Sequence, residues 1–196
     1  TDTNEDNVAI GYNSMAAALG DSKYNVAVGL GTLGSLTTGD SNVAIGKDAM
    51  LENTTGGNNV VIGKDAMFNS NGHGASENVF IGIQSGGGNW AAAANYNVGV
   101  GSYTLMGATS TAQFNTALGQ SAARNLTTGD DNVVIGYAAG DALLGASENV
   151  VIGTQAMGGC DTGIGNVIIG HSAGNHANND VDGAIIIGMN AGQGAL

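Results

Sequence analysis

Few residues in this chain have the types and spacing that catalysis or ligand binding requires. The segment Gly29-Leu30-Gly31-Thr32-Leu33-Gly34 matches the G-x-G-x-x-G pattern of dinucleotide-binding loops. That function needs a helix directly after the loop and a βαβ unit around it. The segment instead shares its position with ten other copies of a repeated phrase, and Thr37-Thr38-Gly39 follows it. We therefore interpret these glycines as structural.

Metal ligands and nucleophiles are equally sparse. The histidines His73, His171 and His176 are scattered, and the single cysteine, Cys160, has no cysteine partner for a zinc site or an internal disulfide. Acidic residues gather just before several copies of the phrase, where their oxygens would suit calcium. These residues are Asp6, Glu77, Asp131, Glu148 and Asp182. Because they lack a repeating Asp-x-Asp spacing, we interpret them as solvated turn residues. We expect no catalytic, cofactor or metal site, with calcium between the repeats as the alternative.

Three segments between copies of the phrase, 68–77, 87–96 and 106–114, are one or two residues longer than most of the others. Extra length in a stacked repeat is expected to bulge outward, and exposed aromatic side chains on loops are frequent anchors of recognition. These segments contain the candidate recognition residues Phe68, His73, Trp90, Tyr96 and Phe114. The alternative is that the rings cap a local apolar patch or cover a neighbouring chain.

The repeated phrase predicts the architecture that positions these residues. It reads Asn-Val-Ala-Ile-Gly, as at 42–46 and 59–63, and its glycines are 17 to 19 residues apart. They are Gly11, Gly29, Gly46, Gly63, Gly82, Gly101, Gly119, Gly136, Gly153, Gly170 and Gly188. Such a period is typical of a solenoid, in which each coil buries its apolar face against the next. We predict an all-β parallel β-solenoid of about eleven coils, forming a single domain over 1–196.

The residues on either side of the middle of the phrase are predicted to form the interior. They are two positions apart, so they share one face of a strand, and they are mostly β-branched. The predicted core residues are Val43, Ile45, Val60, Ile62, Val133, Ile135, Val150 and Ile152. The column between them, from Ala9 to Ile186, is also apolar and points the opposite way. We expect that second face to need a partner surface, because strands that are apolar on both faces are buried on both.

The Asn that opens the phrase is predicted to be structural. It occurs in ten of the eleven copies and is replaced by Ala184 in the last. Asn tolerates left-handed backbone geometry and can hydrogen-bond the same residue of the next coil. The predicted ladder includes Asn42, Asn59, Asn132, Asn149 and Asn166. The glycine after each strand predicts a tight bend or close backbone approach. The small residue three positions later, such as Ala49 or Thr32, predicts crowding.

The composition excludes several partners. The formal net charge is −12 with only four basic residues, which disfavours nucleic acid and anionic membranes. No stretch approaches the roughly 18 apolar residues of a membrane span, so we expect no membrane insertion.

The phrase, with Thr-Thr-Gly turns at 37–39, 54–56 and 127–129, resembles the head repeats of YadA-type trimeric autotransporter adhesins and related repeats of bacteriophage tail fibres. The resemblance covers residues 7–192. It implies a left-handed parallel β-roll, three copies of which pack into a homotrimer around their apolar faces.

Together these features predict a non-enzymatic, extracellular fibrous protein of a cell or virion surface, a segment of a trimeric adhesin or tail fibre that presents a surface for attachment. A host-surface glycan or protein receptor is the expected kind of partner. One alternative is a subunit that stacks head to tail into a filament. Others are an ice-binding solenoid, although Thr-Thr pairs occur in only three coils, and a glycan lyase on a β-helical rod.

Overall fold

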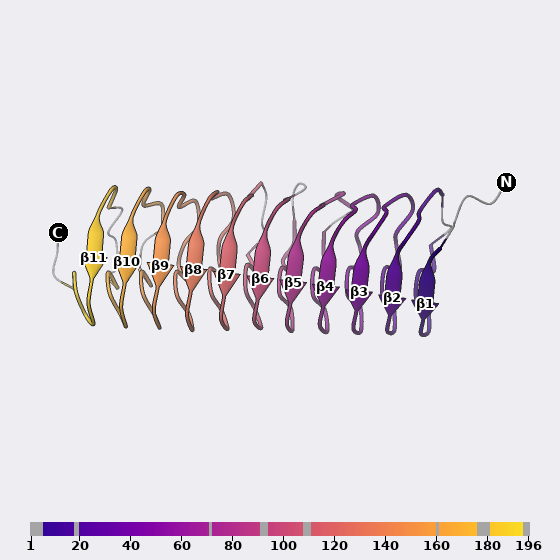
Figure 1. Ribbon diagram of the computed structural model, residues 1–196, viewed down its shortest axis with the longest axis horizontal. Coiled ribbons are helices and arrows are strands. Elements are labelled where there is room, and N and C mark those ends of the chain that lie inside the picture. Colours follow the sequence, from indigo (N-terminus) through magenta and orange to yellow (C-terminus); the bar gives the residue numbers. More distant parts are fainter. Residues whose placement is uncertain are drawn as a thin grey trace.

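The computed structural model describes residues 6–17, 20–70, 72–90, 94–107, 111–159, 161–175 and 181–193. Within these ranges the chain is an all-β parallel β-solenoid, with eleven strands in one sheet and no helix. The strands cross the sheet in sequence order, from one end of an elongated rod to the other (Figure 1). The predicted solenoid is confirmed. The strands are β1 Val8–Ile10, β2 Val26–Val28, β3 Val43–Ile45, β4 Val60–Ile62, β5 Val79–Ile81, β6 Val98–Val100, β7 Thr116–Leu118, β8 Val133–Ile135, β9 Val150–Ile152, β10 Val167–Ile169 and β11 Ile185–Ile187.

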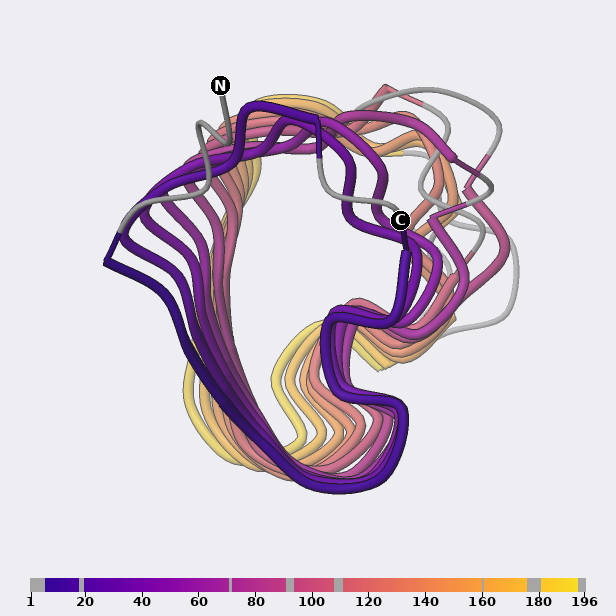
Figure 2. The same ribbon diagram turned by 90° about the vertical axis from the view of Figure 1, so that its right-hand side faces the viewer.

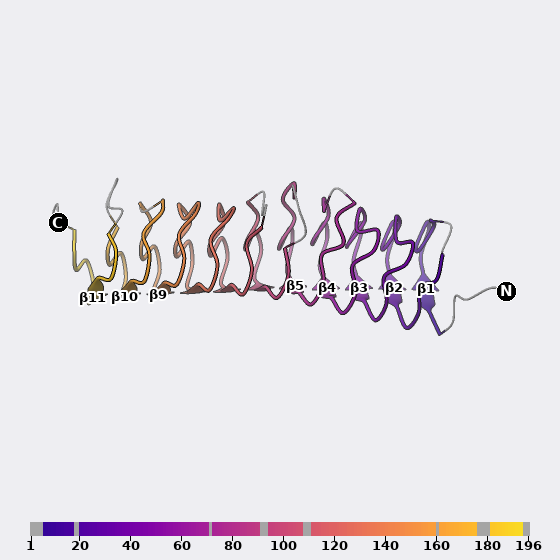
Figure 3. The same cartoon turned by 90° about the horizontal axis from the view of Figure 1, so that it is seen from above.

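Each strand pairs with the next in parallel, residue for residue. β3 and β4, for example, align Val43 with Val60 and Ile45 with Ile62. The backbone N–H of Val43 donates to the carbonyl of Asn59 at 2.8 Å. Residues at the same place in the repeat therefore stack in columns along the rod. The sheet forms one side of the rod, and the rest of each coil turns behind it (Figure 2 and Figure 3).

The middle residue of each strand forms the interior, which corrects the sequence prediction. Ala44, Val61 and Val151 are fully buried, whereas Ile45 is 37% exposed and Val133 is 36% exposed. The other predicted core residues are half-buried on the outside of the sheet, namely Val43, Val60, Ile62, Ile135, Val150 and Ile152.

The reason for the correction is the Asn that opens the phrase. It lies two positions before the middle residue, so strand alternation places both on the same face. The buried Asn amide needs hydrogen-bond partners in the interior of the coil. Because the middle residue of the strand shares its face, the column of small middle residues also points inward. The flanking Val and Ile must then point outward.

The remaining core comes from the turns that follow each strand. The column three residues after the strand-ending glycine is buried and small, as predicted, in Ala49, Ala66 and Ala122. Where a residue of this column is polar, its hydroxyl makes a hydrogen bond to the next coil. Thr32 Oγ1, for example, donates to the carbonyl of Gly46 at 2.7 Å. Larger buried side chains from the same turns fill the rest of the interior, namely Leu33, Leu36, Met50, Met67, Leu105, Leu126, Leu143 and Met157.

The strand-ending glycines stack directly on one another, as their sequence position predicted. Their φ angles lie between 123° and 141°, a region that L-residues rarely adopt. A Cβ at Gly119 would lie 2.6 Å from the carbonyl oxygen of Gly136 in the next coil. Only glycine allows this separation of the two backbones.

Each coil also holds residues in the left-handed region at fixed places. One directly precedes the Asn, and two others lie two and four residues after the glycine, as in Ser41, Asp48 and Met50, with φ of 58°, 55° and 53°. The left-handed position is therefore the residue before the Asn, not the Asn itself. Each such residue costs about 1–2 kcal/mol, which the interactions of the stack must offset.

Candidate interaction face

The inward-pointing Asn residues form a continuous hydrogen-bonded ladder. The backbone N–H and Nδ2 of Asn42 both donate to Oδ1 of Asn25, at 2.9 Å and 3.0 Å. Asn42 Nδ2 also donates to the carbonyl of Gly56 at 2.9 Å. Asn42 Oδ1 in turn accepts the N–H and Nδ2 of Asn59, at 3.1 Å and 2.9 Å.

The same pattern confirms the predicted ladder. Its predicted members are all buried and all bonded to the preceding coil, namely Asn42, Asn59, Asn132, Asn149 and Asn166. Because their amide groups already have partners on both sides, the ladder holds coils together rather than binding a ligand. At its last step the backbone N–H of Ala184 donates to Asn166 Oδ1 at 2.8 Å, and no side-chain amide continues it.

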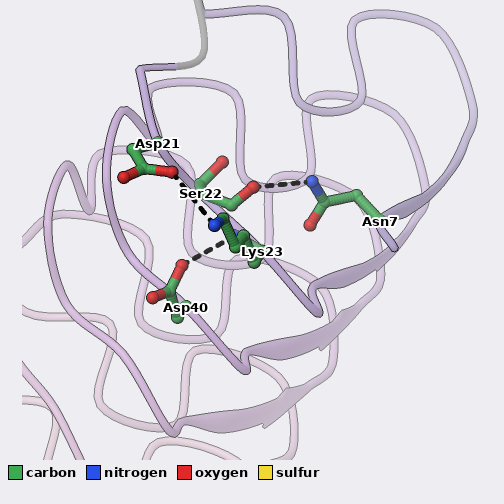
Figure 4. Close-up of polar contacts among 5 residues, drawn as sticks. All are labelled: Asn7, Asp21, Ser22, Lys23 and Asp40. Carbon is green, nitrogen blue, oxygen red and sulfur yellow. Dashed lines mark hydrogen bonds and ion pairs between the residues drawn. The ribbon is translucent and has the colours of Figure 1, made fainter. Parts of the chain in front are cut away.

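A second polar contact joins the coils beside the ladder (Figure 4). Near β1, Asn7 Nδ2 donates to the carbonyl of Ser22 at 2.8 Å. The backbone N–H of Lys23 donates to Asp40 Oδ1 at 2.6 Å, and Lys23 Nζ lies 3.5 Å from Asp21. The carboxylate of Asp40 therefore caps a backbone group of the preceding coil.

The acids considered as calcium ligands are dispersed. Asp182 Oδ1 accepts the backbone N–H of Ile164 at 2.8 Å. The other four lie singly on an exposed row, namely Asp6, Glu77, Asp131 and Glu148. In the part of the chain that the structure describes, no three His, Cys, Asp or Glu side chains are grouped as metal ligands would be. Cys160 and His176 lie outside the described residues.

The first and third residues of the strands form what we name the outer face. None of these residues is buried, and all are Val, Ile or Leu except Thr116. The most exposed, besides those of the two end strands, are Ile45, Val100 and Val133. The outer face is thus an apolar stripe without a charged side chain, running the length of the rod.

Two exposed rows border the outer face. We name the residues directly before the Asn column the acidic row, because its charged members are all acids: Asp6, Tyr24, Ser41, Asn58, Glu77, Tyr96, Phe114, Asp131, Glu148, Gly165 and Gly183. We name the residues directly after the strand-ending glycines the lysine row, in which Lys47 and Lys64 are the charged members and no acid occurs: Tyr12, Leu30, Lys47, Lys64, Ile83, Ser102, Gln120, Tyr137, Thr154, His171 and Met189.

The two lysines contact acids of their own coil. Lys47 Nζ lies 2.9 Å from Asp48 Oδ2, and Lys64 Nζ lies 3.3 Å from Asp65 Oδ2. The hydrogen bond to Asp48, followed by the charge of the same carboxylate, raises the pKa of Lys47. The lysine row is therefore close to neutral, whereas the acidic row is negative.

Trp90 does not lie on the surface, contrary to the sequence prediction. Its side chain is fully buried, and its ring lies edge-on to Phe80 with centroids 6.0 Å apart. Its Nε1 donates to the carbonyl of Gly86 at 3.1 Å. Gly99 accommodates the Phe80 ring, which lies 2.8 Å from where a Cβ would be. The segment 87–96 therefore encloses Trp90, while its Tyr96 is exposed.

The other four candidates differ in their exposure. Tyr96 is 43% exposed and Phe114 is 52% exposed, and their rings stack at 4.9 Å with an interplanar angle of 5°. Both belong to the acidic row. Phe68 and His73 are half-buried, so of the five candidates the structure brings only Tyr96 and Phe114 together.

Sequence reasoning missed further members of this surface. Tyr24 is 57% exposed with φ of 61°, in the same column as Tyr96 and Phe114. Tyr12 and Tyr137 are exposed on the lysine row. The signal was available, because each of these residues lies next to the Asn or glycine of the phrase.

Comparison of the chain with protein-family models, with curated proteins and with solved structures finds no match. Among the described residues, no helix has the length and apolar character needed to cross a membrane.

Proposed function

We propose that this chain is a non-enzymatic, extracellular fibrous segment that works as a homo-oligomer, most simply a trimer, and holds a surface for attachment to a host or receptor. A trimeric adhesin or a phage tail fibre fits this description. The observation that carries the proposal is the outer face, because an apolar stripe of this length on a rod calls for a covering surface.

The size of the outer face supports a second copy as its cover. With the acidic row and the lysine row included, the outer face spans eleven strands about 4.8 Å apart and seven residues at about 3.3 Å each, which is about 50 Å by 20 Å, or about 1,000 Å². A stable protein–protein interface buries about 800 Å² on each partner. The face therefore has the area that a specific association requires.

The ladder supports a mechanical role. Every coil is joined to the next by strand hydrogen bonds and by the buried Asn column. Contacts of this kind resist local opening, because opening one coil leaves buried amides without partners. A rod of this construction suits a task in which a surface is held away from a cell or virion.

Head-to-tail stacking is the second candidate, because β1 and β11 each pair on one side only in the described chain. Their Val8, Ile10, Ile185 and Ile187 side chains are exposed. Ala184, however, has no side-chain oxygen to accept the N–H of an incoming Asn7. The Asn ladder would break at that junction, so we favour lateral association.

The ice-binding alternative loses support from the threonine hydroxyls. Thr37 Oγ1 donates to the carbonyl of Thr54 at 2.9 Å, and Thr127 Oγ1 donates to the carbonyl of Leu144 at 2.8 Å. These hydroxyls link successive coils rather than forming a free, regular array.

The test is the mass of the chain in solution over a wide concentration range, by light scattering after size exclusion. We expect a constant mass of three chains. Ile62→Glu and Ile135→Glu should yield folded monomers by circular dichroism, because each puts a charge into the outer face. Thr128→Glu, on an exposed turn, is the matched control and should remain trimeric. A wild-type monomer would refute the proposal, and mass that grows with concentration would favour the filament.

A further inference from the structure

Two exposed aromatic rings of the acidic row lie together on the rod, outside the buried core. Tyr96 is 43% exposed and Phe114 is 52% exposed, and their rings are nearly parallel with centroids 4.9 Å apart. That distance is close to the spacing of about 4.8 Å between neighbouring strands. The pair therefore lies along the rod, and each ring keeps one face turned away from the other, toward the next coil of the row.

Carboxylates flank this pair on both sides. Glu77 lies one coil before Tyr96, and Asp131 lies one coil after Phe114 and is followed by Glu148. All three acids are exposed, and among the described residues no side chain makes a hydrogen bond or ion pair to their carboxylates. Five successive coils thus present acid, ring, ring, acid and acid over about 19 Å. We name these five residues the aromatic patch.

The four basic residues of the chain do not neutralise the patch. The three lysines contact acids elsewhere. The guanidinium of Arg124 lies 5.9 Å from the ring centroid of Tyr103, which is outside the patch. The negative charge of the patch is therefore uncompensated, on a chain whose net charge is −12. Charge complementarity requires a partner that brings positive charge, and it disfavours anionic glycans.

The free ring faces and the neighbouring acids suit guanidinium groups. A cation within about 6 Å of a ring centroid, over the face of the ring, is attracted by the ring quadrupole. The guanidinium of arginine is planar, stacks on aromatic faces and binds a carboxylate through two parallel hydrogen bonds. One arginine can lie over Tyr96 and pair with Glu77, and a second can lie over Phe114 and pair with Asp131.

The backbone supports a role for the two rings. Tyr96 and Phe114 have φ of 61° and 59°, which is unfavourable for bulky residues, whereas other coils place Ser41, Asn58 or Gly165 in this column. Backbone strain of this kind is concentrated at functional sites. A contact between the rings and a partner would offset its cost.

The position of the patch keeps it accessible in the proposed oligomer. The acidic row lies at the edge of the outer face, and the edge of a protein interface is polar and open to solvent. A partner can therefore reach the ring faces while the outer face is covered.

We propose that the aromatic patch binds an extended, arginine-containing segment of a partner protein, with one guanidinium on the free face of each ring. The two cations then lie no more than about 17 Å apart, which is the 4.9 Å between centroids plus about 6 Å at each end. Arginines four residues apart in an extended chain are about 13 Å apart and fit this limit. The site names the kind of partner for the attachment role proposed above and rests on that role, whatever the number of chains in the oligomer.

The test is the binding of a short, fluorescently labelled peptide to the full chain, followed by anisotropy at several salt concentrations. The peptide has two arginines four positions apart, with glycine and serine elsewhere. We expect saturable binding of one peptide per chain, weakening as salt is added. A peptide with lysine in place of both arginines should bind more weakly, and one with glutamine should not bind.

Variants of the chain locate the site. Tyr96→Asn combined with Phe114→Asn should weaken binding about fivefold to thirtyfold, the effect of two exposed cation–π contacts. Asn tolerates the backbone geometry of this column, so the variant should fold. Glu77→Gln combined with Asp131→Asn should weaken binding and reduce its dependence on salt. Tyr137→Gln removes an exposed tyrosine from the lysine row and is the matched control, which should bind as the unsubstituted chain does.

Four results would each overturn the proposal: no binding of the arginine peptide, equal binding of the lysine peptide, unchanged binding without the two rings, or equal weakening by Tyr137→Gln. A neutral oligosaccharide that binds only when the rings are present would assign the patch to a glycan and also overturn it. Light scattering on the same samples separates this site from the lateral association. A monomer that binds the peptide refutes only the association, whereas a trimer that does not bind it refutes only the docking site.

Discussion

Replacing one stacked glycine with alanine is expected to separate two neighbouring coils. A Cβ at Gly119 would lie 2.6 Å from the carbonyl oxygen of Gly136 and 2.8 Å from its carbonyl carbon. Both are backbone atoms, so no side-chain movement relieves the clash, and ordinary contact begins at 3.4 Å. β7 and β8 must therefore move apart by about 0.8 Å, which takes the hydrogen bonds between them, now 2.8 Å long, out of good geometry.

Gly188→Ala is the matched control for this substitution. Gly188 has φ of 128°, close to the 123° of Gly119, but its Cβ would meet only the Cβ of Ala191, at 3.7 Å. Both variants therefore carry the backbone strain of about 1–3 kcal/mol. Gly119→Ala alone also weakens the strand and ladder hydrogen bonds, at about 1 kcal/mol each for several bonds. We expect it to lose about 3 kcal/mol more than the control.

The assay is urea unfolding followed by circular dichroism, at one chain concentration because association shifts apparent stability. Gly119→Ala should lower the free energy of unfolding by about 4–6 kcal/mol, or prevent folding altogether. Gly188→Ala should lower it by only the backbone strain of about 1–3 kcal/mol. Equal losses in the two variants would refute the reasoning, since backbone angle alone would then explain the glycine.

Three further experiments test other parts of the structure. Asn132→Ala should lower the free energy of unfolding by about 2–4 kcal/mol, because it leaves buried partners unpaired. The exposed Asn58→Ala should lower it by about 1 kcal/mol, because Ala tolerates the left-handed φ of 60° less well than Asn does. Equal urea midpoints would contradict this. Trp90→Ala should lower the free energy of unfolding by about 3–5 kcal/mol, whereas Phe114→Ala should lower it by under about 1 kcal/mol. In the unsubstituted chain, the fluorescence of the single tryptophan should be blue-shifted and protected from acrylamide quenching. Burial raises the pKa of Asp141 above its usual value of 3.8, so its contribution to stability falls as pH rises from that value. Asp141→Asn should therefore raise the Tm at pH 7, with a gain in the free energy of unfolding of less than about 0.5 kcal/mol because the group is partly solvated. An unchanged or lower Tm would contradict the shift.

The repeat made the architecture predictable. Glycines at 17 to 19 residue intervals required successive strands to stack in register, and β3 and β4 do align Val43 with Val60. The ladder of Asn42 and Asn59 followed from the recurrence of one amide residue at one place. Such features depend on spacing alone, which the sequence displays directly.

The direction in which the side chains point was less accessible. Ala44 and Ile45 both read as apolar, so hydrophobicity did not decide which of them lies inside. Asn42 decides which face of the strand lies inside, because its amide is buried and needs hydrogen-bond partners there. Trp90 was misjudged for a related reason, because added length was assumed to lead outward. The chain instead buries Trp90 against Phe80 and offsets the bulk of the Phe80 ring with Gly99.

The equivalence of the coils has a consequence for the length of the rod. Because Val43 and Val60 occupy identical positions in successive coils, deleting residues 43–59 would place β4 on β2 with the same contacts that β3 now makes. The rod would shorten by about 4.8 Å without changing either end. Duplication of a single coil would lengthen it by the same step. Distance between the two ends can therefore vary in evolution by whole coils, independently of whatever surface the rod presents.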